Sequence, residues 1–179
     1  MTNAPRHEPV AIPIQQLESA TVRLCGDSGD GMQLAGRQFA RASARMGNAV
    51  SCLPDYPAEI RAPAGTLAGV SGFQVHLSSR PVATPADRLD VLLAMNPAAL
   101  QANLKDLAFG GVLIVNSDAF QPAEWAKAGY TANPLDDGAL ASFKVWRVPI
   151  DALTRDAVAK INLMPREVDR CRNFVCLLY

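Results

Sequence analysis

The chain has 179 residues, a length that suits one domain with a substantial buried core. Hydrophobic residues make up 49% and charged residues 19%, a composition that excludes wholesale disorder. The 17 basic side chains balance 17 acidic ones, which gives no argument for a nucleic-acid or anionic-membrane partner, and no apolar run is long enough to cross a bilayer.

The N-terminal segment, residues 1–18, is rich in proline and polar residues and lacks the apolar stretch of a signal peptide. We therefore expect a disordered extension and a cytoplasmic protein.

A strand–loop–helix–strand pattern follows this segment. Thr21–Cys25 alternates as a strand does, and Met32–Met46 places apolar residues at helical spacing, with Gly47 suited to end the helix. Ala49–Leu53 reads as a second strand. A unit of this kind predicts that the two strands pair in parallel.

Continuous apolar strands alternate with helices along the rest of the chain. The expected strands are Gly69–Ser78, Leu89–Met95, Gly111–Asn116 and Trp146–Ile150, and the expected helices are Pro97–Leu107 and Ala152–Ile161. Asn116 to Asp118 should cap whatever follows that strand, and Asp151 should cap the second helix. This pattern predicts an α/β fold of three layers, Rossmann-like, with a mostly parallel sheet and helices on both faces.

We assign residues 19–164 to one domain. Residues 165–179 read as the start of a helix that stops within an apolar run, with neither a glycine cap nor a basic last turn. We therefore expect a truncated fragment whose C-terminal part is missing.

The cysteines suggest no metal site. Cys25 and Cys52 lie in apolar, strand-like runs, where a small buried thiol is expected. No C-x-x-C motif occurs, so we predict that this chain carries no zinc, iron–sulfur cluster or other metal of its own.

The main candidate site is a glycine-rich loop between the first strand and its helix, formed by Gly26, Asp27, Ser28, Gly29, Asp30, Gly31 and Met32. Such a loop allows a ligand to approach the backbone, and the helix N-terminus offers N–H groups to a phosphate. Gly29 should hold a conformation closed to β-branched residues or lie against a ligand. A tight turn that only packs the helix remains an alternative.

Two better-known glycine motifs fit this loop poorly. Its order is G-x-x-G-x-G and not the dinucleotide order G-x-G-x-x-G, and only Asp55 comes close to ending the second strand with an acidic residue. Gly29-Asp30-Gly31 imitates the start of a thiamine diphosphate site, but Asn48 arrives too soon to complete it. We reject thiamine binding at this position.

A second candidate lies in the proline-rich loop from Pro54 to Thr66. Glu59 and Arg61 share one side of this segment and could contact a ligand or a partner subunit. An exposed ion pair of little energetic value is the alternative.

The two loops together resemble the γ-type domain of the 2-oxoacid:ferredoxin oxidoreductases, in the form found at the front of the α subunit of 2-oxoglutarate enzymes. The resemblance spans residues 21–179 and is carried by Gly26–Met32, Leu53–Gln74, Asn96–Leu100 and Arg172–Phe174.

This resemblance implies a part of an enzyme that oxidatively decarboxylates a 2-oxoacid, here 2-oxoglutarate, to its acyl-CoA and passes electrons to ferredoxin. It implies that this domain handles coenzyme A and subunit contacts, with Gly26–Met32, Glu59 and Arg61 as binding residues. Thiamine diphosphate, Mg²⁺ and iron–sulfur clusters would lie in other α and β portions of the complex, and the fragment alone would be inactive. The alternatives are a non-catalytic interaction domain and a free-standing nucleotide-binding protein.

Overall fold

The computed structural model describes residues 16–57 and 69–178. Its strands are β1 (Ser19–Asp27), β2 (Ala49–Asp55), β3 (Val70–Ser78), β4 (Leu89–Ala94), β5 (Leu107–Asn116) and β6 (Lys144–Val148). Its α-helices are α1 (Met32–Arg45), α2 (Pro97–Asn103), α3 (Pro122–Lys127), α4 (Ile150–Val158), α5 (Pro165–Arg170) and α6 (Arg172–Leu178). Short 3-10 helices span Leu104–Asp106 and Ser117–Ala119. The extension predicted for residues 1–18 lies almost wholly outside the described residues.

The strands form one sheet in the order β2-β3-β1-β4-β5-β6. β1, β4, β5 and β6 pair in parallel, whereas β3 pairs antiparallel with both β1 and β2. Every described strand except β3 therefore runs in one direction, and the predicted α/β fold with a mostly parallel sheet is confirmed.

The predicted parallel pairing of the first two strands is wrong. β2 runs in the same direction as β1, but β3 lies between them and pairs with both. The crossover through α1 fixes the direction of β2 and leaves a gap one strand wide, which β3 fills.

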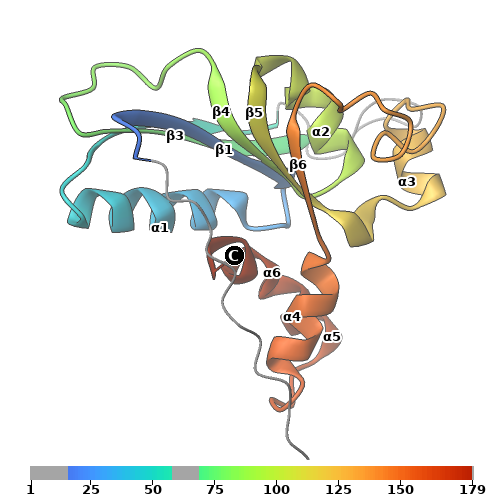
Figure 1. Ribbon diagram of the computed structural model, residues 1–179. Coiled ribbons are helices and arrows are strands. Elements are labelled where there is room, and N and C mark those ends of the chain that lie inside the picture. The colour runs from blue at the N-terminus through green and yellow to red at the C-terminus, as the bar shows by residue number, and fades with distance from the viewer. Residues whose placement is uncertain (1–15, 58–68, 179) are drawn as a thin grey trace, which may run out of the picture.

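Helices cover both faces of the sheet (Figure 1). On one face, α1, α4 and α6 pack on a core that includes Leu24, Leu93 and Met95. On the other face, α2 and the segments after β5 pack on a core that includes Cys25 and Leu92. Neighbouring residues of one strand enter opposite cores because side chains alternate across a sheet.

The helix ends correct two of the predicted caps. Gly47 follows α1 with φ +92°, as expected of a residue that ends a helix. However, Asn116 and Asp118 cap α4 and not the segment directly after them. Asn116 Oδ1 accepts from the Ile150 N–H (3.1 Å) and Asp118 Oδ2 accepts from the Ala152 N–H (2.8 Å). Asp151 lies in the first turn of α4 and is not its cap.

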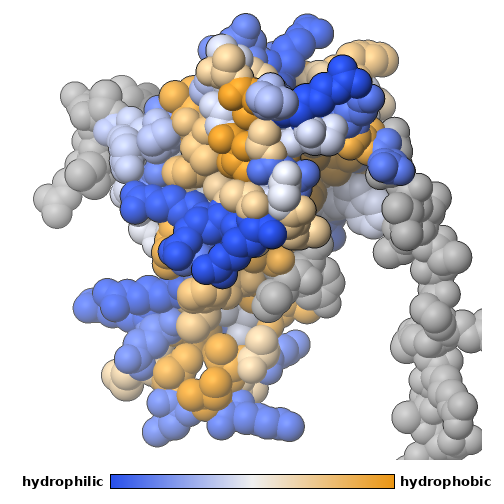
Figure 2. Space-filling view, turned by 90° about the vertical axis from the view of Figure 1, so that its left-hand side faces the viewer, coloured by the Kyte–Doolittle hydropathy of each residue, from blue (hydrophilic) through white to orange (hydrophobic). Residues whose placement is uncertain are grey.

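The C-terminal helices form a unit beneath the sheet (Figure 1). The helix predicted from residue 165 onward is broken at Cys171 into α5 and α6, and α6 returns to pack on α1 and α4. Figure 2 shows an apolar patch over the lower part of this unit. Ile161 and Met164, in the connection between α4 and α5, are both exposed.

Two further features bear on the sequence predictions. Cys25 is buried as expected, but Cys52 is exposed because β2 is an edge strand. Among the described residues, no helix is long and apolar enough to span a membrane.

Candidate functional site

Polar residues gather where the parallel strands β1, β4 and β5 end. Asp27 ends β1, Asn96 follows β4 and caps α2, and the buried Asn116 ends β5. Between β1 and β4 the chain changes from α1 on one face to α2 on the other. In open α/β sheets the crevice at such a point is the usual place for a ligand.

The glycine-rich loop after β1 is held closed by its own acidic residues. The Asp30 N–H donates to the Asp27 carbonyl oxygen (3.0 Å), and the Asp27 N–H donates to Asp30 Oδ2 (2.9 Å). Asn96 Nδ2 donates to Asp27 Oδ1 (2.8 Å), which ties the loop to the start of α2. A Cβ atom on the buried Gly26 would lie 2.6 Å from Asp30 Oδ2, so a larger residue would displace the Asp30 carboxylate from this position.

Within the glycine-rich loop, the residue with a left-handed backbone is Gly31 and not Gly29. Gly31 precedes α1 with φ +74°, and a Cβ atom there would collide with the side-chain amide of Asn173 in α6. Gly29 has no positive φ, and a Cβ atom there would meet nothing within 4 Å. The predicted conformation of Gly29 is therefore wrong, and its contact with a ligand stays a prediction.

The remaining residues of the loop differ in their access to a ligand. Asp27, Ser28 and Gly29 are exposed at the turn. Met32 is buried, with its side chain in the core beside Leu24, so a ligand would meet only its backbone.

Arg172 of α6 bridges the glycine loop and α4. Its Nη2 lies 3.5 Å from Asp30 Oδ1, and its Nη1 lies 3.4 Å from Asp151 Oδ1. Asn116 Nδ2 also donates to Asp151 Oδ1 (3.3 Å). The guanidinium thus faces two carboxylates from elements far apart in the sequence.

Burial raises the pKa of the Asp30 carboxyl above its usual value. The hydrogen bond from the Asp27 N–H and the charge of Arg172 both oppose this shift. The net direction shows that removal from water outweighs the attraction to Arg172.

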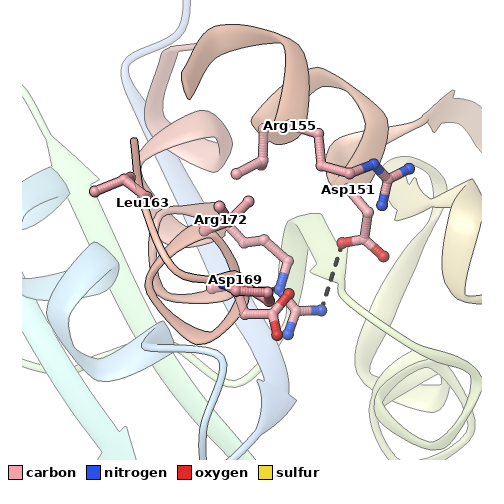
Figure 3. Close-up of a pocket in the computed structure, with 8 residues that line it drawn as sticks. Asp151, Arg155, Leu163, Asp169 and Arg172 are labelled. Carbon is pink, nitrogen blue, oxygen red and sulfur yellow. Dashed lines mark hydrogen bonds and ion pairs between the residues drawn. The ribbon is translucent and has the colours of Figure 1, made fainter. Parts of the chain in front are cut away.

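A pocket of about 280 Å³ opens beside this ion pair, between α4, α5 and α6 (Figure 3). Asp151 and Arg172, which pair with each other, both line it, and Arg155 and Asp169 add one charge of each sign. Leu163 and Val168 supply part of its apolar wall. The pocket therefore combines an apolar wall with a balanced set of charges.

The N-terminus of α1 supplies backbone N–H donors to the site. Within the described part of the chain, no side chain caps the N-terminus of α1, so the N–H groups of its first turn are donors for a phosphate or carbonyl oxygen. The carboxylates of Asp27 and Asp30 beside them weaken the attraction for an anion. Among residues 16–57 and 69–178, no three metal-ligating side chains come together.

Glu59 and Arg61 lie outside the described residues, and their predicted contacts stay predictions. The start of their loop is placed next to α1, because Gln33 Nε2 donates to the carbonyl oxygens of Asp55 (2.9 Å) and Gly72 (2.7 Å).

Asn96, Asp151, Arg172 and Asn173 were not chosen as site residues from the sequence. Two of the segments that carried the family resemblance, Asn96–Leu100 and Arg172–Phe174, contain three of them. These residues are far from the loop in the sequence, so no local pattern links them to it. The fold places them beside the loop.

Comparison with known proteins gives one family. Residues 21–178 match the family described as pyruvate ferredoxin/flavodoxin oxidoreductase. The chain is 48% identical over 163 residues to the 2-oxoglutarate oxidoreductase subunit KorA of Mycobacterium tuberculosis, a match that covers 91% of this chain and 25% of KorA. It is 32% identical over 115 residues to the ketoisovalerate oxidoreductase subunit VorA of Methanothermobacter thermautotrophicus, covering 63% of this chain and 23% of VorA. The chain thus spans about a quarter of the length of these curated relatives.

Solved structures share the fold. The 2-oxoglutarate:ferredoxin oxidoreductase of Magnetococcus marinus, solved with 2-oxoglutarate, coenzyme A and succinyl-CoA bound, matches with a TM-score of 0.64 and 22% identity over 90% of this chain and 24% of its own. The γ subunit of a keto/oxoacid ferredoxin oxidoreductase from Geobacter sulfurreducens matches with a TM-score of 0.56 and 20% identity, over 89% of this chain and 96% of its own.

Proposed function

Because the chain belongs to the pyruvate ferredoxin/flavodoxin oxidoreductase family, we propose that it is the γ-type domain of a 2-oxoacid:ferredoxin oxidoreductase. The observation that carries the proposal is the 48% identity with KorA over nearly the whole chain. We propose 2-oxoglutarate as the substrate, since KorA is a subunit of a 2-oxoglutarate enzyme. The enzyme converts the 2-oxoacid to its acyl-CoA and passes electrons to ferredoxin.

Within that enzyme, the proposed role of this domain is to bind coenzyme A and contact other subunits. The uncapped first turn of α1 fits a phosphate, with the backbone N–H groups from Met32 onward as donors. Asp30 fits a phosphate poorly while it is ionised, but its raised pKa makes the neutral form more accessible. Glu59 and Arg61 remain proposed contacts of the second loop.

The redox chemistry is proposed to reside in other portions of the complex. Thiamine diphosphate with Mg²⁺ would supply the decarboxylation, and iron–sulfur clusters would carry electrons to ferredoxin. The 179 residues alone are then expected to be inactive. We propose a cytoplasmic location, consistent with the free thiols of all four cysteines.

The function is tested on the complete enzyme with all its polypeptides. We expect reduction of ferredoxin that requires both 2-oxoglutarate and coenzyme A. Reduction with pyruvate and none with 2-oxoglutarate would contradict the proposed substrate, and failure with every 2-oxoacid would contradict the proposed activity.

The binding of coenzyme A has its own test. If a phosphate lies at the start of α1, Asp30→Asn removes a nearby negative charge and should tighten coenzyme A binding about two- to fivefold. The matched control is Asp156→Asn, at an exposed position of α4. Equal affinities of both variants and the wild type in calorimetric titration would place the phosphates elsewhere.

One observation favours a second candidate, a domain that contributes only subunit contacts. The glycine loop satisfies its own polar groups through Asp30, and Gly31 is packed against Asn173. Such a loop would hold its shape without a ligand. Full assembly of the complex together with no coenzyme A contact in this domain would support that candidate.

A further inference from the structure

We propose that an apolar groove between β5, β6 and α6 is the docking surface for an uncharged, apolar segment of the polypeptide that adjoins this domain in the longer relatives. The proposal rests on the proposed function, because it takes this chain to be one domain of a larger enzyme.

The groove lies beneath β5 and β6, on the same face of the sheet that α1 covers elsewhere. It has a volume of about 370 Å³ and is lined by Val112 and Ile114 of β5, Trp146 and Val148 of β6, and Val175 and Cys176 of α6, among others. Trp146 is 62% exposed. A large exposed tryptophan at the mouth of an apolar groove is typical of a protein–protein contact.

The lining defines the chemistry of the occupant. The described residues that line it include no charged side chain, and the one titratable group among them is the Cys176 thiol. That thiol lies 3.5 Å from Met95 Sδ, and burial raises its pKa to about 12, so it is neutral at physiological pH. A charged group in the groove would lose its water without gaining a partner. The occupant is therefore aliphatic or aromatic at this contact.

The relatives indicate where this occupant comes from. The matched segment makes up 25% of KorA and 24% of the Magnetococcus chain, so both carry about three times as much polypeptide besides. The same fold accounts for 96% of the separate Geobacter γ subunit. Since this unit occurs both fused and separate, the natural candidate to cover its open apolar face is the remainder of the enzyme.

A second copy of this chain is a poorer occupant. β6 is the edge strand beside the groove, and it carries Lys144 and Arg147 with no acidic residue. Arg147 is paired with Asp136 (2.7 Å), but two copies that met at this edge would still bring two Lys144 ammonium groups to one seam, and lysines on edge strands discourage self-association.

The test measures the protection of Trp146→Cys in the complete assembled enzyme. Alkylation by N-ethylmaleimide is followed by mass spectrometry of the peptide, in native and in denatured protein. The substitution is at an exposed position, so the domain should still fold. The matched control is Phe109→Cys, which is 87% exposed at the other end of β5. We expect native alkylation at position 146 to be at least about tenfold slower than in the denatured protein, and position 109 to react faster than 146.

Each outcome bears on the proposal. A native rate at position 146 within about twofold of the denatured rate overturns it. Protection that disappears on deletion of residues 1–15 would make that segment the occupant, and protection lost on dilution of a homodimer would make it a second copy; both overturn it. The 2-oxoacid activity of the same preparation is measured in parallel. A protected but inactive enzyme would contradict the proposed function only, and an active enzyme with an open groove would contradict the docking only.

Discussion

Helix α6 borders two regions of opposite character. Arg172 and Asn173 at its start contact the glycine loop, where Arg172 pairs with Asp30 and the Asp27 N–H donates to Asp30. Val175 and Cys176, one turn later, line the apolar groove beneath β5 and β6. This short helix therefore packs against the glycine loop at its start and lines the exposed apolar groove one turn later.

This difference indicates which of the two regions needs polypeptide from outside this chain to cover it. The loop has its partners within this chain, because Asp27, Asp30, Asn96 and Arg172 bind one another. Among the described residues, the groove exposes apolar surface to solvent. Covering this surface with a partner would be favourable, because it removes apolar area from water. The shape of the loop should thus survive separation from the enzyme, whereas the groove should be covered only within it.

The largest expected effect comes from Gly31→Val in the loop. The left-handed backbone at Gly31 is unfavourable for a β-branched residue, and the new side chain would collide with Asn173. We expect the free energy of unfolding to fall by about 3 kcal/mol or more, measured by urea denaturation and circular dichroism. Gly29→Val is the matched control, with a loss below about 1 kcal/mol, since its position is open. Equal losses would show that α6 does not fix the loop.

The next largest effect comes from Arg172→Met. This change leaves Asp30 and Asp151 without their shared cation while keeping much of the side-chain volume. Arg172 is 27% exposed and its contacts are long, so we expect a loss of about 1–3 kcal/mol, below that of a fully buried pair. The matched control, Arg80→Met, breaks an exposed pair with Glu18 and should cost less than about 0.5 kcal/mol. A loss no larger than that of the control would mean that the ion pairs do not hold α6 to the loop.

Much of this fold could be predicted from the sequence because its elements are local. The amphipathic spacing of α1, the apolar run of β4 and Gly47 at a helix end depend on neighbours a few residues apart. The family resemblance stated from the glycine loop and the segment from Leu53 to Gln74 is likewise confirmed by the match over residues 21–178.

What could not be predicted depends on long-range order. The insertion of β3 between β1 and β2 follows from strand pairing, which hydrophobic periodicity does not encode. For the same reason Cys52, expected to be buried, proved to be on an edge strand. The pairing of Asp30 with Arg172 joins residues 142 positions apart, and the choice of Gly31 over Gly29 depends on α6 lying against the loop.

A third prediction concerns pH and Asp30. Because its pKa is raised in the folded protein, the neutral carboxyl contributes stability below the pKa of the unfolded chain, and this contribution is lost as pH rises through the folded pKa. Asp30→Asn keeps a side-chain oxygen for the Asp27 N–H without this loss. The variant should be at least as stable as the wild type at pH 7, and any gain should shrink toward pH 3. A variant that is less stable at pH 7 would show that attraction to Arg172 outweighs burial.

The smallest expected effect lies at the groove and bears directly on the comparison. In the 179-residue chain Trp146 is 62% exposed, so Trp146→Thr removes little buried area and keeps a residue suited to a strand. We expect the free energy of unfolding of this chain to change by less than about 0.5 kcal/mol. Val175→Ala, in the same groove, is the matched control. Val175 is only 8% exposed, and its truncation should cost about 2 kcal/mol through lost burial and a residual cavity. If Trp146→Thr costs as much as Val175→Ala, this chain already covers the tryptophan, and the groove is not open to the rest of the enzyme.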